Sequence, residues 1–173
     1  MPRLIYSVAA SLDGSIADAR GGYDWIPADP DIDFAAIYAR FDVLVMGRKT
    51  WEVMRTAGAP PMPGVRVVVA SRTLRPEHCP NATVTADPAA AVADLKRRPG
   101  KDLWLFGGGE LFRDLLAAGL VDRVEVAVTP VLLGNGVPIL PGDAGAKLRL
   151  VKHRLYEKSG IVMLTYDVVQ RRG

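Results

Sequence analysis

The sequence has few of the residues that build metal centres and disulfide frameworks. Its 173 residues include one cysteine and two histidines. A single cysteine cannot form a disulfide within the chain, so nothing points to the oxidising environment of secreted proteins. Zinc sites need Cys, His or acidic ligands clustered at short spacing, and the sequence shows no such cluster. We therefore predict that the protein holds no metal ion.

Long hydrophobic runs are also absent. No apolar stretch approaches the ~20 residues that a membrane-spanning helix needs, and the one near the N-terminus is too short for a signal peptide. The 22 basic residues barely outnumber the 19 acidic ones, and they are scattered rather than gathered into a patch. These features predict a cytoplasmic protein that binds neither a membrane nor nucleic acid.

The common nucleotide-binding and hydrolase motifs are missing as well. There is no G-x-x-x-x-G-K-[ST] P-loop and no G-x-S-x-G elbow, which argues against a P-loop NTPase and against a serine hydrolase. The triplet Gly107, Gly108 and Gly109 is not a dinucleotide fingerprint, because Phe112 stands where G-x-G-x-x-G requires its third glycine. Either the triplet turns the chain, or it lets a ligand touch the backbone.

Short apolar runs rich in β-branched residues recur along the chain. Such runs are typical of strands that are buried on both faces of a parallel sheet. They occupy residues 4–9, 43–46, 65–70, 103–106, 124–128 and 161–169. The segments between them favour helices, at residues 31–41, 49–54, 87–98 and 110–119. Asp87 is the expected N-cap of the third helix, and Gly119 is the expected stop of the fourth.

The alternation of strands and helices predicts right-handed βαβ crossovers and a mostly parallel sheet. The last segment differs, because two extended runs flank residues 157–160, which indicates an antiparallel hairpin. The length suits one domain with a sizeable core. We expect a single domain over 1–173 with an α/β fold of three αβα layers, a mostly parallel central sheet and an antiparallel C-terminal hairpin.

Glycines, small hydroxyl residues and arginines follow the predicted strands. Ligands of open α/β sheets bind beyond the carboxyl ends of the strands, so these are the residues that a ligand would meet. Two of the turns open helices, and the free N–H groups of a helix N-terminus attract phosphate. Arg48, Lys49 and Arg72 add positive charge at the same edge. The sequence therefore predicts a site for a phosphate-bearing ligand.

Several segments resemble a known family. Residues 43–52 (VLVMGRKTWE), 67–74 (VVVASRTL) and 103–140 are similar to the dihydrofolate reductase superfamily. Residues 11–17 (SLDGSIA) and 129–141 (TPVLLGNGVPILP) look more like the reductase (C-terminal) domain of the bacterial riboflavin biosynthesis deaminase-reductase. The motifs keep the family's order over most of the chain. No zinc deaminase signature occurs in the sequence, so the resemblance is to the reductase domain alone and no deaminase domain is expected.

The resemblance implies NADPH as the hydride donor, and it distributes the motif residues around that cofactor. Four residues lie along the pyrophosphate: Gly47, Arg48, Lys49 and Thr50. Two lie at the adenosine ribose and its 2′-phosphate: Ser71 and Arg72. Six approach the pyrophosphate and the nicotinamide: Phe106, Gly107, Gly108, Gly109, Glu110 and Leu111. Four line the nicotinamide pocket: Ala9, Ala10, Ile16 and Ala17.

Three aspartates are candidates for a catalytic carboxylate. In dihydrofolate reductase one carboxylate on the first helix binds the pterin and supports protonation, and Asp31 or Asp33 falls near that place. Both also stand where the first turn of a helix favours acids, so helix capping is the other interpretation. Asp13, in the SLDG segment, is either a turn residue or a substrate contact. The predicted substrate-binding residues are Trp25, Phe34 and Thr129.

The predicted function is NADPH-dependent reduction of a small pyrimidine- or pterin-type heterocycle, as in 5-amino-6-(5-phosphoribosylamino)uracil reductase of the riboflavin pathway. A phosphate on the substrate would need positive or N–H groups, which Lys152, Arg154 or residues 134–136 offer. The alternatives are a dihydrofolate reductase, a reductase of another heterocycle, and a non-catalytic NADPH-binding or regulatory domain. The C-terminal edge strand and the resemblance both point to a homodimer.

Overall fold

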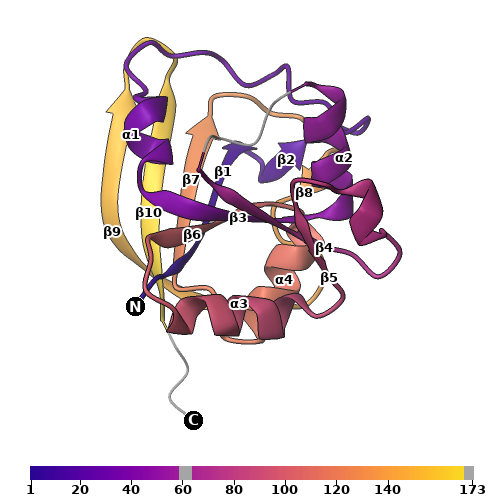
Figure 1. Cartoon of the computed structure of the whole chain (residues 1–173). Coiled ribbons are helices and arrows are strands. Elements are labelled where there is room, and N and C mark those ends of the chain that lie inside the picture. Colours follow the sequence, from indigo (N-terminus) through magenta and orange to yellow (C-terminus); the bar gives the residue numbers. More distant parts are fainter. Residues whose placement is uncertain (59–63, 170–173) are drawn as a thin grey trace.

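An eight-stranded sheet forms the centre of the computed structural model, which describes residues 1–58 and 64–169. The strand order is β5-β4-β3-β6-β1-β7-β10-β9 (Figure 1). Six strands run parallel: β1 (Leu4–Ser11), β3 (Phe41–Gly47), β4 (Arg66–Ala70), β5 (Thr83–Thr85), β6 (Asp102–Gly107) and β7 (Arg123–Thr129). The antiparallel hairpin consists of β9 (Lys147–Tyr156) and β10 (Ile161–Val169). The expected α/β fold is confirmed.

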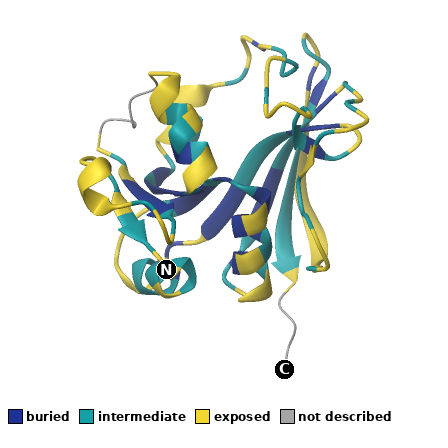
Figure 2. Ribbon diagram, turned by 90° about the vertical axis from the view of Figure 1, so that its right-hand side faces the viewer, coloured by how far each residue is buried: buried dark blue, intermediate teal, exposed yellow. Residues whose placement is uncertain are grey.

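Helices cover both faces of the sheet, which gives the three expected layers (Figures 1 and 2). They are α1 (Phe34–Tyr38), α2 (Arg48–Thr56), α3 (Pro88–Arg97) and α4 (Gly109–Ala117). On one face, Leu44 and Met46 of the sheet pack with Trp51 of α2. On the other face, Tyr6 packs with Phe112 and Leu115 of α4. Successive strand residues point to opposite faces, so a continuous apolar run such as residues 43–46 serves both cores.

The helix ends agree with the sequence at two positions and differ at a third. The Asp87 side chain accepts a hydrogen bond from Ala90 N at 2.9 Å, and Gly119, with φ +69°, follows the end of α4. The helix expected over 31–41 is wrong in extent, because α1 has only five residues. The Asp33 carboxylate caps Ala36 N at 2.9 Å and starts the helix late, while β3 begins at Phe41.

A second, two-stranded sheet lies beside the ends of the central strands. It pairs β2 (Ser15–Ala17) with β8 (Val137–Pro138), and neither short strand was expected from the sequence. Backbone hydrogen bonds extend the contact from Leu12 N to Val131 O (2.8 Å) and from Ile139 N to Gly14 O (2.9 Å). The small sheet therefore holds the chain after β7 against the chain after β1. In the described residues, every helix is too short and too polar to cross a membrane.

Candidate functional site

The carboxyl ends of β3, β4 and β6 lie next to one another at one edge of the sheet. Gly47 pairs with Ala70 on one side, and Met46 pairs with Gly107 on the other. The residues that follow these strands are therefore neighbours in space although up to 60 positions separate them in the sequence. This placement agrees with the expectation that the glycines and arginines after the strands gather at one edge.

Two helices begin at this edge without a side-chain cap. Gly47 precedes α2 and Gly108 precedes α4, and neither residue supplies a capping hydrogen bond in the described structure. The other two α-helices are capped by carboxylates, those of Asp33 and Asp87. A Cβ atom added at Gly108 would lie 4.0 Å from Gly47 N, so the two helix starts are adjacent. Their first-turn N–H groups concentrate positive partial charge at one place.

The structure answers the question of the glycine triplet at Gly108 and Gly109, and a further glycine outside the triplet, Gly47, behaves differently. Gly109 is a packing position, because an added Cβ would lie 2.9 Å from both Pro138 O and Pro141 Cδ. Gly108 has φ +98°, a conformation that residues with side chains rarely adopt. Gly47 differs from both, since a Cβ there would meet no described atom within 4 Å and its φ is an ordinary −79°. The open approach to the backbone is therefore at Gly47.

Positive side chains border the two helix starts. The Arg48 guanidinium donates from Nη1 to Thr73 Oγ1 at 3.3 Å, which links the start of α2 to the segment after β4. There the Ser71 hydroxyl accepts hydrogen bonds from Thr73 N (3.2 Å) and Leu74 N (2.9 Å). This turn leaves Arg72 exposed, next in the chain to Thr73, which Arg48 contacts. The residues predicted to bind the pyrophosphate and those predicted to bind the 2′-phosphate are thus brought together.

The end of β1 supplies small residues to the same region. Ala9 is half-buried and lies two positions from Ser7, whose carbonyl accepts a hydrogen bond from Trp104 Nε1 at 2.8 Å. Ala10 is 2% exposed and faces the other side of the sheet, because consecutive strand residues alternate. The Ala9 side chain therefore faces the α1 side of the sheet, whereas the Ala10 side chain does not. Ile16 and Ala17 are half-buried in β2.

Thr129 and Asp13 both stabilise the chain around this edge. Thr129 is fully buried, and its hydroxyl donates to Ala10 O at 3.1 Å. The Asp13 carboxylate accepts hydrogen bonds from the Ser11 hydroxyl (2.6 Å), Gly134 N (2.7 Å) and Leu133 N (3.1 Å). These bonds, the one from Ser11 first, lower the pKa of Asp13 to about 2. Asp13 is therefore ionised at neutral pH and is poorly suited to donate a proton.

The aspartates before α1 have separate partners. Asp33 caps the helix, and exposed Asp31 accepts a hydrogen bond from Lys158 Nζ at 2.9 Å. Asp29, which sequence reasoning missed, is 5% exposed and accepts from Asp31 N and Ser159 N, both at 2.9 Å. Hydrogen bonding to Ser159 lowers the pKa of Asp29. A catalytic role for Asp31 or Asp33 stays a prediction.

Aromatic residues connect α1 to the sheet on the same side as Ala9. Phe34 and Tyr38 lie with ring centroids 6.0 Å apart, and the Tyr38 ring lies 5.8 Å from Trp104. Trp104 in turn lies 5.1 Å from Phe106. Phe34 is 53% exposed and Tyr38 is 38% exposed, which is high for rings of this size. Sequence reasoning named Phe34 but missed Tyr38, whose spacing of four residues along a helix was the available signal.

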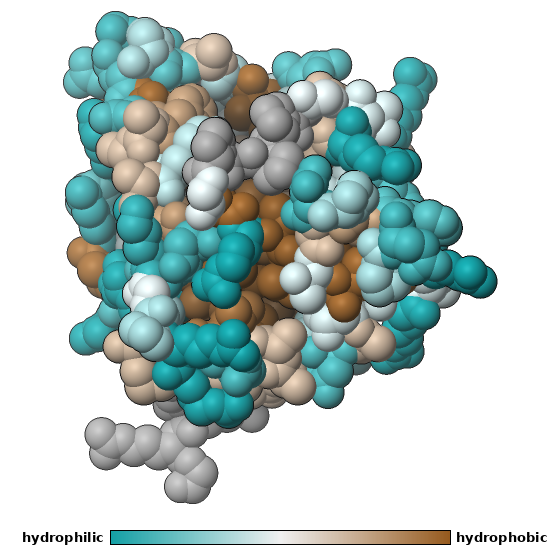
Figure 3. All heavy atoms as spheres, in the orientation of Figure 1, coloured by the Kyte–Doolittle hydropathy of each residue, from teal (hydrophilic) through white to brown (hydrophobic). Residues whose placement is uncertain are grey.

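A hollow opens on the face of the molecule that carries α1 and α2 (Figures 1 and 3). Figure 3 shows it with an apolar floor and a largely polar rim. Trp25, also predicted to bind substrate, is half-buried and donates from Nε1 to Gly22 O at 3.0 Å. Trp51 packs in the core and is 7% exposed. A flat ring in the hollow would meet the exposed aromatic faces of α1 on one side and the ends of the strands on the other.

Residues 2–162 match the family described as the RibD C-terminal domain. The chain belongs to this family. It is 30% identical over 177 residues to YyaP of Bacillus subtilis (strain 168), a match that covers 95% of this chain and 94% of YyaP. It is also similar to a crystal structure from Shewanella sp. PV-4 assigned to riboflavin biosynthesis, with a TM-score of 0.83, 27% identity and coverage of 98% and 100% of the two chains.

The RibD C-terminal fold also appears in a Thermotoga maritima structure named as a diaminohydroxyphosphoribosylaminopyrimidine deaminase and 5-amino-6-(5-phosphoribosylamino)uracil reductase. The TM-score is 0.70 at 17% identity, and the match covers 97% of this chain and 57% of that one. At this identity the likeness shows the fold alone. Membership in the family makes this chain a reductase-like domain with the mostly parallel sheet and antiparallel C-terminal strands described above.

Proposed function

We propose that the protein is an NADPH-dependent oxidoreductase that reduces a pyrimidine- or pterin-type heterocycle. One observation carries this proposal: the uncapped starts of α2 and α4 meet beside Arg48 and Arg72. Free N–H groups at helix N-termini, together with arginines, are the groups that bind a polyphosphate. Membership in the RibD C-terminal domain family supports reductase chemistry at this edge.

The residues present fit a dinucleotide phosphate. The first-turn N–H groups of α2 and α4 would hold the pyrophosphate, because Gly47 leaves their approach open. Exposed Arg72 would hold a 2′-phosphate, which favours NADPH over NADH. The small side chain of Ala9 leaves room for the nicotinamide beside the Phe34 and Tyr38 rings of α1. When bound, NADPH supplies the hydride.

The chain's own residues would bind and orient the heterocycle in the hollow beside α1. Phe34 and Tyr38 offer exposed ring faces for stacking and exclude water from the reacting side. Arg154 would bind a phosphate on the substrate, because it lies on the same face of the sheet as Ala9. The two residues are linked across β1, β7, β10 and β9 by successive register partners: Ala9, Ala127, Met163 and Arg154. We therefore infer that a phosphorylated aminopyrimidine, the substrate class in the name of the Thermotoga protein, is the best candidate.

The assay that tests this function measures NADPH oxidation with 5-amino-6-(5-phosphoribosylamino)uracil and with dihydrofolate side by side. Turnover of the first substrate supports the riboflavin-type reductase, and turnover of dihydrofolate alone would assign the protein to pterin reduction. Tight NADPH binding without turnover of either would make it a non-catalytic cofactor-binding domain. Comparing the KM of the first substrate with that of its dephosphorylated form measures how much the phosphate contributes to substrate binding.

Substitution of Gly47 tests the cofactor site without disturbing the fold. Valine fits the extended backbone there (φ −79°, ψ 165°) and meets no described atom within 4 Å, so its side chain would stand in the space proposed for the pyrophosphate. We expect Gly47→Val to raise the NADPH dissociation constant by about tenfold or more, equivalent to at least about 1.4 kcal/mol. Isothermal titration calorimetry measures the change.

Gly145→Val is the matched control for Gly47→Val. A Cβ at Gly145 also meets nothing within 4 Å, and its φ lies outside the left-handed region. This variant should bind NADPH as the unmodified protein does. Equal affinity of both variants would remove Gly47 from the cofactor site.

A further inference from the structure

Helix α1 carries the Phe34 and Tyr38 rings beside the hollow, yet little of the helix is shielded from solvent. It has five residues, all of them described, and none is buried. A helix of one and a half turns is unstable in isolation, so its position depends on tertiary contacts. Apolar contacts join α1 and its flanks to the sheet through half-buried Ile37, which packs against the core, and through the Tyr38 and Phe41 rings beside Trp104. Polar contacts of Arg40 and Lys101 hold its C-terminal end.

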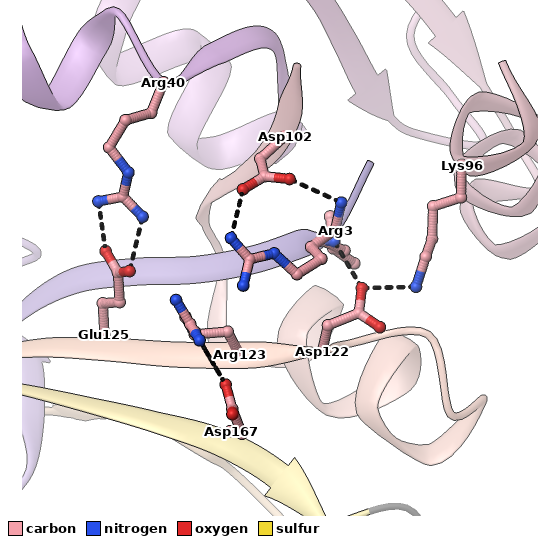
Figure 4. Close-up of polar contacts among 9 residues, drawn as sticks. Arg3, Arg40, Lys96, Asp102, Asp122, Arg123, Glu125 and Asp167 are labelled. Carbon is pink, nitrogen blue, oxygen red and sulfur yellow. Dashed lines mark hydrogen bonds and ion pairs between the residues drawn. The ribbon is translucent and has the colours of Figure 1, made fainter. Parts of the chain in front are cut away.

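The strongest of these contacts joins Arg40 to Glu125, a residue of the central strand β7. The guanidinium donates from Nη1 to Oε2 at 2.9 Å and from Nη2 to Oε1 at 2.6 Å (Figure 4). A two-bond fork of this kind sets both the distance and the orientation of its partners. Arg40 lies two residues after Tyr38, so the fork determines where α1 ends over the sheet. Lys101 Nζ supports the same turn by donating to Ala39 O at 2.8 Å.

Polar residues of three neighbouring strands lie around this ion pair. Glu125 pairs in register with Ser7 of β1 and with Thr165 of β10, so all three side chains share the α1 face of the sheet. Glu125 is 6% exposed, and in the described part of the chain Arg40 is its ion-pair partner. A buried carboxylate without a cation is strongly unfavourable. Arg40 must therefore stay in this position, and α1 stays with it.

We propose that Arg40 and Glu125 are positioning residues that set the spacing between α1 and the sheet, and thereby the affinity of the hollow for its heterocyclic substrate. The pair fixes the end of the helix that carries Phe34 and Tyr38, while the cofactor edge at Gly47 and Gly108 belongs to other elements. Loss of the fork therefore weakens substrate binding and leaves NADPH binding intact. This inference rests on the proposed function in naming the substrate and in placing it in the hollow.

Arg40→Met tests the pair, with Arg123→Met as the matched control. Arg123 lies two residues from Glu125 on the same face and forks onto Asp167 at 2.7 and 2.9 Å, but it ties β7 to β10 rather than to α1 (Figure 4). We expect Arg40→Met to raise the KM for 5-amino-6-(5-phosphoribosylamino)uracil by about tenfold or more and to change the NADPH dissociation constant less than about twofold. Arg123→Met should leave both values within about twofold.

A double variant separates positioning from stability. Arg40→Met combined with Glu125→Leu removes the unpaired buried charge, so thermal stability should return toward that of the unmodified protein. The KM should stay high, because the apolar pair does not restore the fork. Recovery of KM together with stability would overturn the proposal, since the pair would then act through stability alone.

Hydrogen exchange provides a readout that needs no substrate. In Arg40→Met the amides of residues 34–38 should exchange about tenfold faster than in Arg123→Met, while those of β1 and β6 stay protected. Equal exchange in the two variants would refute the anchoring role. If the unmodified protein reduces no heterocycle, the proposed function fails, but this exchange experiment still decides whether the pair holds α1.

Discussion

At the scale of single residues, Asp13 shows how one carboxylate can join two loops. Its oxygens accept from the Ser11 hydroxyl and from two N–H groups after β7, Leu133 N and Gly134 N. The sequence left a turn residue and a substrate contact as alternatives. All three bonds favour the charged form and occupy the carboxylate within the protein, so the geometry supports a structural role at the edge of the site.

The low pKa of Asp13 predicts a measurable dependence of stability on pH. The folded-state pKa of about 2 lies below the ordinary value of 3.8, so the carboxylate stabilises the fold fully above the unfolded-state pKa. That contribution is lost as the pH falls through about 2. Asp13→Asn should be less stable than the unmodified protein at pH 7, and the difference should shrink between pH 4 and pH 2. Urea denaturation at several pH values measures it.

The exposed Asp143 provides the control for this pH experiment. Asp143→Asn, a surface substitution, should leave the free energy of unfolding at pH 7 within about 0.5 kcal/mol of that of the unmodified protein. A difference for Asp13→Asn that also stays constant from pH 7 to pH 2 would contradict the assigned bonds.

Gly108 shows where a test designed from sequence alone would mislead. The sequence suggests that Gly108→Val leaves the chain folded while it weakens NADPH binding. The observed φ of +98° makes valine strained at this position whether or not a ligand is present. Lost binding in that variant would not separate a cofactor contact from a distorted turn. Gly47, with its ordinary φ and open surroundings, is the informative position.

At the scale of helices and strands, the capping residues divide the helices into two groups. Helices α1 and α3 begin at aspartates whose carboxylates accept first-turn N–H groups. Helices α2 and α4 begin at glycines, which leave those groups available at the proposed phosphate site. A carboxylate cap there would place a negative charge where a phosphate must bind, so glycine suits a helix start that receives an anion.

The two carboxylates near α1 can be separated by substitutions that keep their local structural roles. Serine is as good an N-cap as aspartate, so Asp33→Ser should keep α1 and keep turnover within about twofold if Asp33 only caps the helix. Asp31→Asn loses an exposed pair with Lys158, worth at most about 1 kcal/mol. Loss of turnover in one of these folded variants, measured by NADPH oxidation, would identify the functional carboxylate.

The sequence predicted the long strands well because buried parallel strands are continuous apolar runs. It missed β2, β5 and β8, which have three, three and two residues and are too short to show an alternating pattern. It overestimated α1 because residues 32–39 have helical spacing, whereas the cap at Asp33 and the start of β3 at Phe41 limit the helix. Local capping and strand entry outweigh a weak amphipathic pattern in so short a segment.

For the site, the residues that follow the strands were predictable because their position is a rule of open α/β sheets. The Arg40–Glu125 pair was not, since its members lie 85 positions apart and meet only through the register of β7 beside β1. Asp29 was missed for a similar reason, because its partner Ser159 belongs to the β9–β10 turn. Sequence motifs predict local geometry, whereas contacts across the sheet can be predicted only when the order of the strands is known.

At the scale of the whole molecule, β9 is the outermost strand of the sheet (Figures 1 and 2). Along its ten residues only Tyr156 is buried, and Leu148, Leu150 and Leu155 are 44%, 51% and 57% exposed. An exposed edge strand can pair with another chain, although the basic residues along the same strand, Lys147, Arg149, Lys152 and Arg154, oppose such pairing. The homodimer expected from the sequence stays a prediction, and β9 is the surface that we propose for it.

Leu150→Lys tests this prediction, with Leu132→Lys as a control at an exposed position outside β9. The charge at position 150 should shift the protein from dimer toward monomer, because it adds like charges to an interface between identical strands. The change at position 132 should leave the dimer intact. Sedimentation velocity at micromolar concentration measures the oligomeric state directly. A monomeric unmodified protein would show that the prediction is wrong.

The position of β1 has a consequence for the order of events during synthesis. The first strand lies inside the sheet between β6 and β7, and Leu4 pairs with Leu103 while Tyr6 pairs with Val124. As the chain leaves the ribosome, β1 therefore has no partner strand until β6 (Asp102–Gly107) has emerged, and it gains its second partner only with β7 (Arg123–Thr129), late in a chain of 173 residues. Contacts so distant in sequence slow folding and leave apolar segments exposed meanwhile. We expect the yield of folded protein to depend on slow translation and chaperones more than its native stability would suggest.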